Sequence, residues 1–230
     1  MHVEVSVEGN EGVSRQERDL KGAIICGYTG RDQEMVRRHI DELAAQGIEP
    51  PPMVPMYFIK PSWGLCLEEE IQVQSPKNSG EVEFVLLVDQ DEIYVGVGSD
   101  HTDREMEKLD MAKSKLVCPS VIGRRFWKFS EIKDHWDRIE LRSWVPRDGQ
   151  MTLYQECDST SFLSPGTLLE KVREQTDMDL TNVPIFCGTS PLLLEGFAYA
   201  ERFEAELFDP VTGRRIALEY NVNVLDWFNA

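Results

Sequence analysis

The sequence predicts a mainly β protein of the α+β class, with a few peripheral helices. Three observations indicate this: many short segments alternate apolar and polar residues, turn-forming residues separate them, and only three segments have helical spacing. The chain has 230 residues, of which 41% are hydrophobic and 28% charged, so it is long enough for a substantial core. We expect one continuous domain.

The first part of that domain, residues 1–55, is expected to contain strands and one helix as a flap or small lobe. Residues 2–8 alternate apolar and polar, and residues 22–27 form a short apolar run, so both segments are predicted strands. Residues 31–46 place apolar side chains on one stripe at helical spacing, which predicts a helix.

The remaining residues, 56–230, are expected to form the main β part of the domain. The alternation favours strands at 56–60, 81–88, 92–97, 138–145, 151–156, 185–190, 203–208 and 215–222. Helices are predicted at 104–115 and 168–176, and residues 118–137 are read as a mixed segment. The last two strands form a hairpin around the turn D-P-V-T-G.

Charge and cysteine content narrow the class of function. The formal net charge of −17 argues against nucleic acid and anionic membrane as partners, because both require basic surfaces. No apolar run reaches the roughly 20 residues of a membrane span, and the N-terminus reads as a strand rather than a signal peptide. The five cysteines are scattered, which favours reduced thiols in a cytoplasmic protein and disfavours a cysteine-based zinc site.

Two carboxylates open the predicted strand G-E-V-E-F-V-L-L-V at residues 80–88. Glu81 and Glu83 project to the same face, next to an apolar run, where they repel each other and lose hydration. A divalent cation with oxygen ligands resolves both costs, and Asp100 follows the neighbouring strand as a third ligand. The alternative is an edge strand that turns its polar face to water.

Five segments, in order along the chain, carry a resemblance to a known family. They are M-Y-F-I-K-P-S (56–62), the strand at 81–88 with G-S-D-H-T-D-R-E (98–105), K-S-K-L-V-C-P (113–119), Y-Q-E-C (154–157) and I-F-C-G-T-S-P (185–191). Over residues 22–222 this order resembles the fumarylacetoacetate hydrolase superfamily, and most closely an uncharacterised, DUF2848-like branch of it. The resemblance implies a mixed β-sandwich roll with lid helices near the N-terminus, and a homodimer.

The resemblance also implies roles for individual residues. Glu81, Glu83 and Asp100 match metal ligands, and the implied ion is Mg²⁺ or Mn²⁺, with Ca²⁺ as a further possibility. Lys113 matches a catalytic lysine near the metal. The positions that match substrate contacts are Arg104, Gln155, Thr189 and His101. Lys113 and Arg104 would offset the carboxylates and hold a small anionic substrate; the alternative for both is ordinary surface charge on a helix. Glu107 stands where the family has a glutamine.

The general base is the main departure from the family pattern. Gln33 replaces the histidine that hydrolytic relatives carry on the lid helix. Six residues on, His39 and Glu42 lie at helical positions i and i+3, where they can act together as a base near neutral pH. The alternative is that His39 packs beside Ile40.

The function expected from these features is metal-dependent hydrolytic C–C cleavage of a 2-oxo acid or 1,3-dicarbonyl compound. Decarboxylation, tautomerisation or isomerisation, and hydration remain open, because one metal site supports all of them. Two further alternatives are a metal-binding homologue without activity and an acidic scaffold that meets a basic partner.

Overall fold

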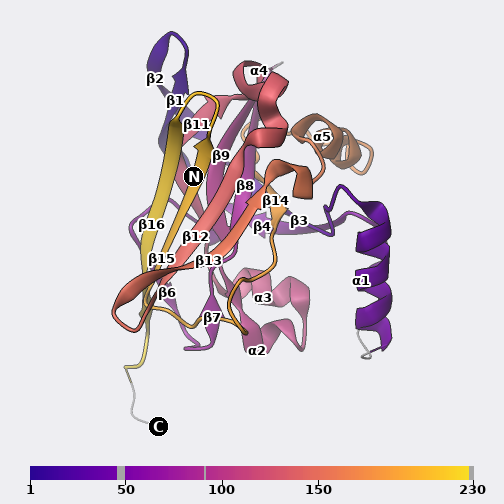
Figure 1. Cartoon of the computed structure of the whole chain (residues 1–230), viewed down its shortest axis with the longest axis vertical. Coiled ribbons are helices and arrows are strands. Elements are labelled where there is room, and N and C mark those ends of the chain that lie inside the picture. The colour runs from indigo at the N-terminus through magenta and orange to yellow at the C-terminus, as the bar shows by residue number, and fades with distance from the viewer. Residues whose placement is uncertain (46–49, 91, 228–230) are drawn as a thin grey trace.

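The computed structural model describes residues 1–45, 50–90 and 92–227, with all their side chains except those of His39 and Leu43. Two mixed β-sheets lie against each other and the helices lie around them (Figure 1). This confirms the expectation of a mainly β fold.

The larger sheet has nine strands in the order β2-β1-β11-β9-β8-β14-β3-β4, with β5 pairing to β11. Its strands are β1 (His2–Gly9), β2 (Gly12–Asp19), β3 (Gly22–Gly27), β4 (Met56–Pro61), β5 (Leu65–Cys66), β8 (Val82–Asp89), β9 (Glu92–Asp100), β11 (Ser120–Lys128) and β14 (Ile185–Thr189). Three strands from residues 1–55 thus share one sheet with strands from the rest of the chain.

This sheet curls back on itself. Its edge strand β4 continues through a 3₁₀ turn, η1 (Ser62–Gly64), into β5, which pairs with β11 on the other side of the sheet. One set of alternate side chains, including Val85, Leu87 and Phe186, therefore packs together inside the curl. The odd-numbered positions of β8 belong to this inner face.

The smaller sheet has five strands in the order β13-β12-β15-β16-β6. Its strands are β6 (Glu70–Val73), β12 (Glu140–Arg147), β13 (Gln150–Asp158), β15 (Arg202–Asp209) and β16 (Arg214–Val224). The even-numbered side chains of β8, such as Phe84 and Leu86, pack against Leu141, Leu207 and their neighbours between the two sheets. The strand β8 is therefore buried on both faces, which explains its continuous apolar run.

The helices are short and peripheral. They are α1 (Gln33–Ala45), α2 (Arg104–Glu107), α3 (Met111–Val117), α4 (Phe129–Ile132) and α5 (Pro165–Arg173), with 3₁₀ turns η2 (Lys133–Arg138) and η3 (Ser159–Ser161). Figure 1 shows α2 and α3 together at one end of the sheets. A two-stranded ladder of β7 (Asn78–Ser79) and β10 (Thr102–Asp103) precedes them. Among the described residues, no helix is both long and apolar enough to cross a membrane.

Several elements differ from the sequence prediction. The helix predicted at 104–115 is two helices, because the Asp110 side chain caps a new helix by accepting the Lys113 N–H. The mixed segment 118–137 contains β11, and β2 and β6 were not predicted. The last residue of the helix predicted at 31–46, Gln46, lies outside the described residues.

Candidate metal centre

Three carboxylates meet where β8 begins and β9 ends. Glu81 immediately precedes β8, Glu83 is its second residue, and Asp100 ends β9. The Asp100 N–H donates to the Glu81 carbonyl at 3.0 Å, which brings the two strand ends together. One carboxylate oxygen of each residue lies within 4.8 Å of those of the other two. The sheet thus brings together the three side chains that the sequence singled out.

The close approach of the strands depends on Gly98, which is paired with Glu83. A β-carbon at this position would lie 2.5 Å from Val85 Cγ2 and 2.8 Å from the Val121 carbonyl oxygen. Any larger residue would push the strands apart. Gly98, the second glycine in G-V-G-S-D, is therefore required for the strands to pack closely at the site.

Lys115 supplies a positive charge between the carboxylates. Its Nζ lies 2.7 Å from Asp100 Oδ2 and 3.0 Å from Glu81 Oε2. Burial disfavours the charge on this lysine, but Asp100 and Glu81 outweigh burial and raise its pKa. Burial likewise opposes the charge on Glu81, yet Lys115 and Arg104 lower the pKa of Glu81 to about 2. Both groups are therefore charged at neutral pH.

Arg104 lies on the other side of Glu81, with only 1% of its side chain exposed. Its Nη2 is 2.9 Å from Glu81 Oε1, its Nη1 donates to Glu107 Oε2 at 2.9 Å, and its Nε donates to Ser79 Oγ at 2.7 Å. The ring of Phe197 lies over the guanidinium, 4.1 Å from centroid to Cζ. Arg104, which the sequence predicted as a substrate contact, therefore has a protein partner at each of its three guanidinium nitrogens. An aromatic ring covers one face of the guanidinium.

Of the two glutamates, Glu83 is the more deeply buried. Its Oε2 accepts the Gly188 N–H at 2.7 Å, and its pKa is raised, first by burial and then by Asp100. Gly188 has φ +89°, and a β-carbon there would lie 2.3 Å from Thr29 Oγ1. Only glycine fits this conformation and this space, so the irregular end of β14 at Gly188 holds Glu83 in place.

Gln155 and Thr189 connect the smaller sheet to β8. The Gln155 amide donates to Thr189 Oγ1 and to the Ser190 carbonyl, both at 2.8 Å, and its oxygen accepts the Val82 N–H at 3.1 Å. Thr189 donates to the Val82 carbonyl at 2.9 Å. Both predicted substrate contacts therefore lie beside the carboxylates, and they hold the backbone between Glu81 and Glu83.

His101 is buried behind the site. Its Nδ1 hydrogen-bonds the Tyr220 hydroxyl at 2.8 Å, and its Nε2 meets Asn78 Oδ1. Burial, followed by Arg104, lowers the pKa of His101 to about 3, so the ring is neutral at physiological pH. Both ring nitrogens have protein partners, so His101 links Tyr220 to Asn78. The sequence had predicted a substrate contact at His101, and neither ring nitrogen is left free for one.

The lysine prediction requires a correction. The Lys113 side chain is 69% exposed and its Nζ pairs with Asp110 at 2.8 Å. Positions two apart on a helix point to nearly opposite sides, so α3 presents Lys113 to solvent and Lys115 to the carboxylates. The K-S-K segment contains the relevant lysine, but the match placed it two residues too early.

Lys60 was missed as a site residue, although it lies in the K-P-S segment. It is 1% exposed, and its Nζ donates to the Lys115 and Cys118 carbonyls and, at 2.9 Å, to Ser120 Oγ. Ser120 in turn donates to Asp100 Oδ1 at 2.9 Å. Lys60 therefore positions both Lys115 and Asp100. A lysine inside an alternating strand was the signal in the sequence that could have revealed it.

The predicted base lies on α1. Glu42 is exposed on this helix, and the side chain of His39 lies outside the described residues. Figure 1 shows α1 at the side of the molecule. The roles given to His39 and Glu42 stay predictions.

The residues fit a hard divalent cation. The donor set is three carboxylates, the ligands that Mg²⁺, Mn²⁺ and Ca²⁺ prefer. Two buried atoms at this point have a single ion-pair contact each among the described residues and no further hydrogen bond: Asp100 Oδ2, 2.7 Å from Lys115 Nζ, and Arg104 Nη2, 2.9 Å from Glu81 Oε1. Such atoms are expected where a cation and an oxygen-bearing ligand complete the site.

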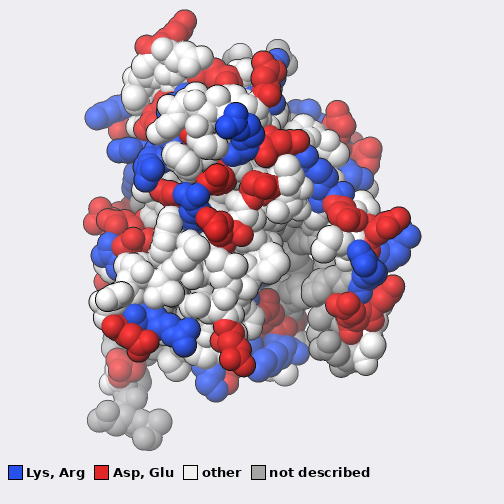
Figure 2. Space-filling model, in the orientation of Figure 1, with Lys and Arg blue, Asp and Glu red and all other residues white. Residues whose placement is uncertain are grey.

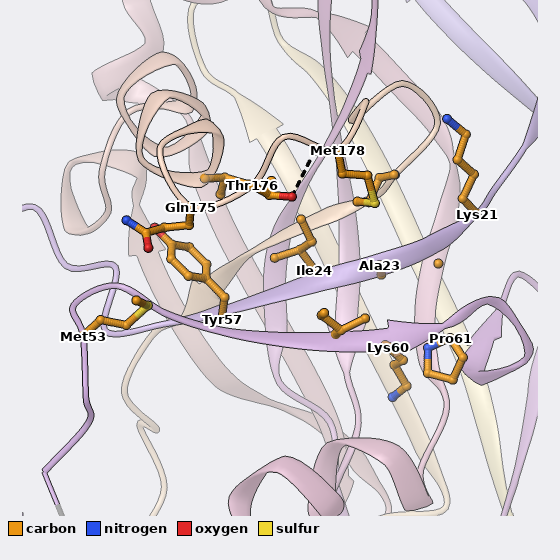
Figure 3. Close-up of a pocket in the computed structure, with 14 residues that line it drawn as sticks. Lys21, Ala23, Ile24, Met53, Tyr57, Lys60, Pro61, Gln175, Thr176 and Met178 are labelled. Carbon is orange, nitrogen blue, oxygen red and sulfur yellow. Dashed lines mark hydrogen bonds between the residues drawn. The ribbon is translucent and has the colours of Figure 1, made fainter.

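An apolar cavity of about 410 Å³ lies apart from the carboxylates, on the outer side of β3 and β4 beside α5 (Figure 3). Ile24, Tyr57 and Met178 line it, and the Lys60 side chain points away from it. On the face shown in Figure 2, Lys and Arg side chains are interspersed among Asp and Glu.

The fold resembles that of several solved structures. A yeast fumarylacetoacetate hydrolase family protein superposes with a TM-score of 0.59 and 18% identity, over 89% of this chain and 94% of that one. A 5-carboxymethyl-2-hydroxymuconate delta-isomerase from Mycobacterium smegmatis gives 0.62 and 15%, over 97% and 100%. A 2-keto-3-deoxy-D-arabinonate dehydratase, complexed with magnesium and 2,5-dioxopentanoate, gives 0.63 and 14%, over 91% and 76%. The fold is therefore the fumarylacetoacetate hydrolase fold, as predicted.

The family itself follows from the sequence. Residues 26–220 match the family model DUF2848, described as a protein of unknown function, and the chain belongs to that family. The chain matches no curated protein sequence. The predicted resemblance to this branch is confirmed.

Proposed function

We propose that this protein is a divalent-metal-dependent enzyme that acts on a small 2-oxo acid or 1,3-dicarbonyl compound. The observation that carries the proposal is the convergence of Glu81, Glu83 and Asp100, one carboxylate oxygen of each lying within 4.8 Å of those of the other two. Mg²⁺ or Mn²⁺ is the proposed ion, and it would supply Lewis-acid activation of a substrate carbonyl oxygen.

The protein's own groups would prepare the site. Lys115 is held charged next to two of the proposed ligands, where its ammonium can donate to negative charge that develops on a substrate oxygen. Arg104 Nη2 lies 2.9 Å from Glu81 Oε1, and its second N–H could donate to the substrate. The backbone contacts of Gln155 and Thr189 fix the strand that carries the glutamates, so the donors are positioned before the substrate binds.

The proposed reaction is hydrolytic cleavage of a C–C bond. We place the general base on α1, at His39 with Glu42, because their spacing in the sequence puts both on one side of the helix. Fumarylacetoacetate hydrolase family proteins share this fold, and so do an isomerase and a dehydratase. Decarboxylation, isomerisation and hydration or dehydration are therefore the alternatives, and they differ in their need for an activated water.

The proposal includes a homodimer. Its support is the edge of the larger sheet, where Ile59 on β4 is 82% exposed and Trp63 on η1 is 74% exposed. Light scattering of Ile59→Lys should give a monomer if this edge is the interface. A wild-type monomer, or a variant that stays dimeric, would contradict the assignment.

The test of function is a spectrophotometric screen of acylpyruvates, oxaloacetate and related diketo acids with Mg²⁺ or Mn²⁺. We expect metal-dependent turnover by the wild-type protein. His39→Ala should lose at least about 100-fold in kcat if His39 is the base, whereas Arg38→Ala, on the same helix, should retain activity. Cleavage that is insensitive to His39→Ala would show that His39 is not the general base, and it would leave the proposed metal site unaffected.

A further inference from the structure

A linear network of hydrogen bonds connects β7 and the smaller sheet to the backbone of Glu81, a proposed metal ligand. At its first end, Asn78 Oδ1 contacts His101 Nε2. His101 Nδ1 lies 2.8 Å from the hydroxyl oxygen of Tyr220, on β16, and this oxygen lies 2.8 Å from Ser99 Oγ. Ser99 Oγ accepts the Glu81 N–H at 3.1 Å. The four side chains are buried, so each of their polar groups depends on its partner in the protein.

The direction of the hydrogen bonds follows from the Asn78 end of the network. Asn78 Nδ2 donates to the Ser75 carbonyl, so the amide oxygen, which can only accept, faces His101. His101 Nε2 therefore carries a proton. The His101 ring is buried and both of its partners are uncharged, so a charged ring would lack a counter-ion in contact with it. The ring is thus neutral, and its Nδ1 is an acceptor.

The remaining bonds of the network follow in order. Because His101 Nδ1 accepts, the Tyr220 hydroxyl donates its only proton to it. The Tyr220 oxygen can then only accept from Ser99, and this uses the hydroxyl proton of Ser99. The lone pairs of Ser99 Oγ receive the Glu81 N–H. Each donor thus has one acceptor, and reversing a single bond would bring two lone pairs or two protons into contact.

The network ends on a residue whose backbone the strand ladder does not hold. Glu81 lies immediately before β8, so its N–H depends on Ser99, while its carbonyl accepts the Asp100 N–H at 3.0 Å. The two polar backbone groups of Glu81 are therefore held by consecutive residues at the end of β9. Since the carboxylate is carried by this backbone, the bond from Ser99 helps to fix where the carboxylate lies.

Aromatic packing from the smaller sheet supports the same point. The ring of Tyr220 lies 5.5 Å from that of Phe203, measured between centroids. A β-carbon on Gly80 would lie 2.5 Å from Phe203 Cδ2, so the Phe203 ring packs directly on the backbone next to Glu81. The strands β15 and β16 therefore reach the start of β8 in two ways, through this ring and through the Tyr220 hydroxyl.

We infer that Tyr220 and His101 are positioning residues for the metal ligand Glu81, that they act through Ser99, and that His101 does so as the tautomer protonated at Nε2. This inference rests on the proposed function, because it assigns these residues a task in metal binding. The task is to hold the backbone of Glu81 in place before the ion binds. Partners of this kind, which contact a ligand and not the metal, commonly raise metal affinity.

A double-mutant cycle on Mn²⁺ affinity, measured by calorimetry, tests the positioning role. Tyr220→Phe removes only the hydroxyl group, and Ser99→Ala removes the acceptor of the Glu81 N–H. We expect each variant to raise the Mn²⁺ dissociation constant about tenfold. Because Tyr220 acts through Ser99, the double variant should bind no more weakly than Ser99→Ala alone. Tyr57→Phe is the matched control, since Tyr57 lines the separate apolar cavity, and it should bind Mn²⁺ as the wild type does.

Nitrogen NMR of histidine-labelled protein tests the tautomer. The His101 signals, assigned as those missing from His101→Gln, should show a protonated Nε2 and an unprotonated Nδ1. A protonated Nδ1 would overturn the direction of the network.

Urea unfolding separates a role in positioning from one in folding alone. A lower unfolding midpoint for Tyr220→Phe with unchanged Mn²⁺ affinity would overturn the positioning role, and so would losses of affinity that add in the double variant. Both results leave the proposed function intact, because the wild-type protein still binds the ion. If the wild-type protein binds no Mn²⁺, the proposed function fails and this inference fails with it.

Discussion

The ammonium of Lys115 lies 2.7 Å from Asp100 Oδ2, and both side chains are at least nine-tenths buried. Glu81 shares the same ammonium, while Glu83 is held from the opposite side by the Gly188 N–H. Four charged groups are therefore enclosed at the end of the curled sheet, and their charges balance only in part. This imbalance makes the site sensitive to single substitutions and to divalent cations.

Replacement of Lys115 by methionine should destabilise the metal-free protein strongly. The change leaves Glu81 and Asp100 buried without their cation, a situation that costs about 3 kcal/mol in the free energy of unfolding. Urea unfolding with and without Mn²⁺ measures this cost, and Mn²⁺ should restore part of the loss. Lys113→Met is the control and should leave the unfolding midpoint unchanged, because Lys113 is exposed. Equal midpoints for the two variants would show that Lys115 does not hold the carboxylates.

Gly188→Ala should weaken the site through Glu83. The added methyl group would collide with Thr29 Oγ1 and strain a backbone with φ +89°. We expect a loss of about 1–3 kcal/mol in the free energy of unfolding, together with weaker metal binding. Gly166→Ala, on α5 in open space, should be neutral or slightly stabilising. If both variants behave alike, the backbone conformation of Gly188 is not a constraint on the site.

Lys60 should give the protein a distinct alkaline pH dependence. Burial lowers the pKa of Lys60 from 10.5 to about 8, so between these values the unfolded chain binds more protons than the folded one. Stability attributable to this residue is therefore fully present above pH 10.5 and is lost as the pH falls through 8.

Lys60→Met provides the comparison. The free energy of unfolding of wild type minus that of the variant should rise with pH between 8 and 10.5, by up to about 1.4 kcal/mol per pH unit. Urea denaturation at several pH values in this window measures the slope. A difference that stays constant, or falls, would show that burial does not lower the pKa of Lys60 in the folded protein.

Much of the site could be predicted because it depends on local sequence. Glu81 and Glu83 alternate on one strand, and Asp100 follows its antiparallel neighbour, so the pleat and the pairing register determine their meeting. The strand β8 itself was visible as an apolar run. The C-terminal hairpin of β15 and β16 was equally clear, because alternation and a turn signal agree there.

The rest depends on contacts between distant segments. Lys60 reaches Lys115 and Ser120 only because β4 turns into β5 and the sheet curls, which no local pattern records. The choice between Lys113 and Lys115 depends on where the Asp110 cap starts a new helix, since that sets which face is buried. Strand β11 lacks clear alternation because it is covered on both faces at several positions.

The central claim is that the three carboxylates bind one divalent cation, and Mn²⁺ titration tests it most directly. Calorimetry and electron paramagnetic resonance of the wild-type protein should show one Mn²⁺ per chain, and Glu83→Gln should weaken binding at least about 100-fold. Glu105→Gln should bind as the wild type does, because Glu105 lies outside the cluster. Stoichiometric Mn²⁺ binding that is unaffected by Glu83→Gln, or no binding at all by the wild-type protein, would contradict the account.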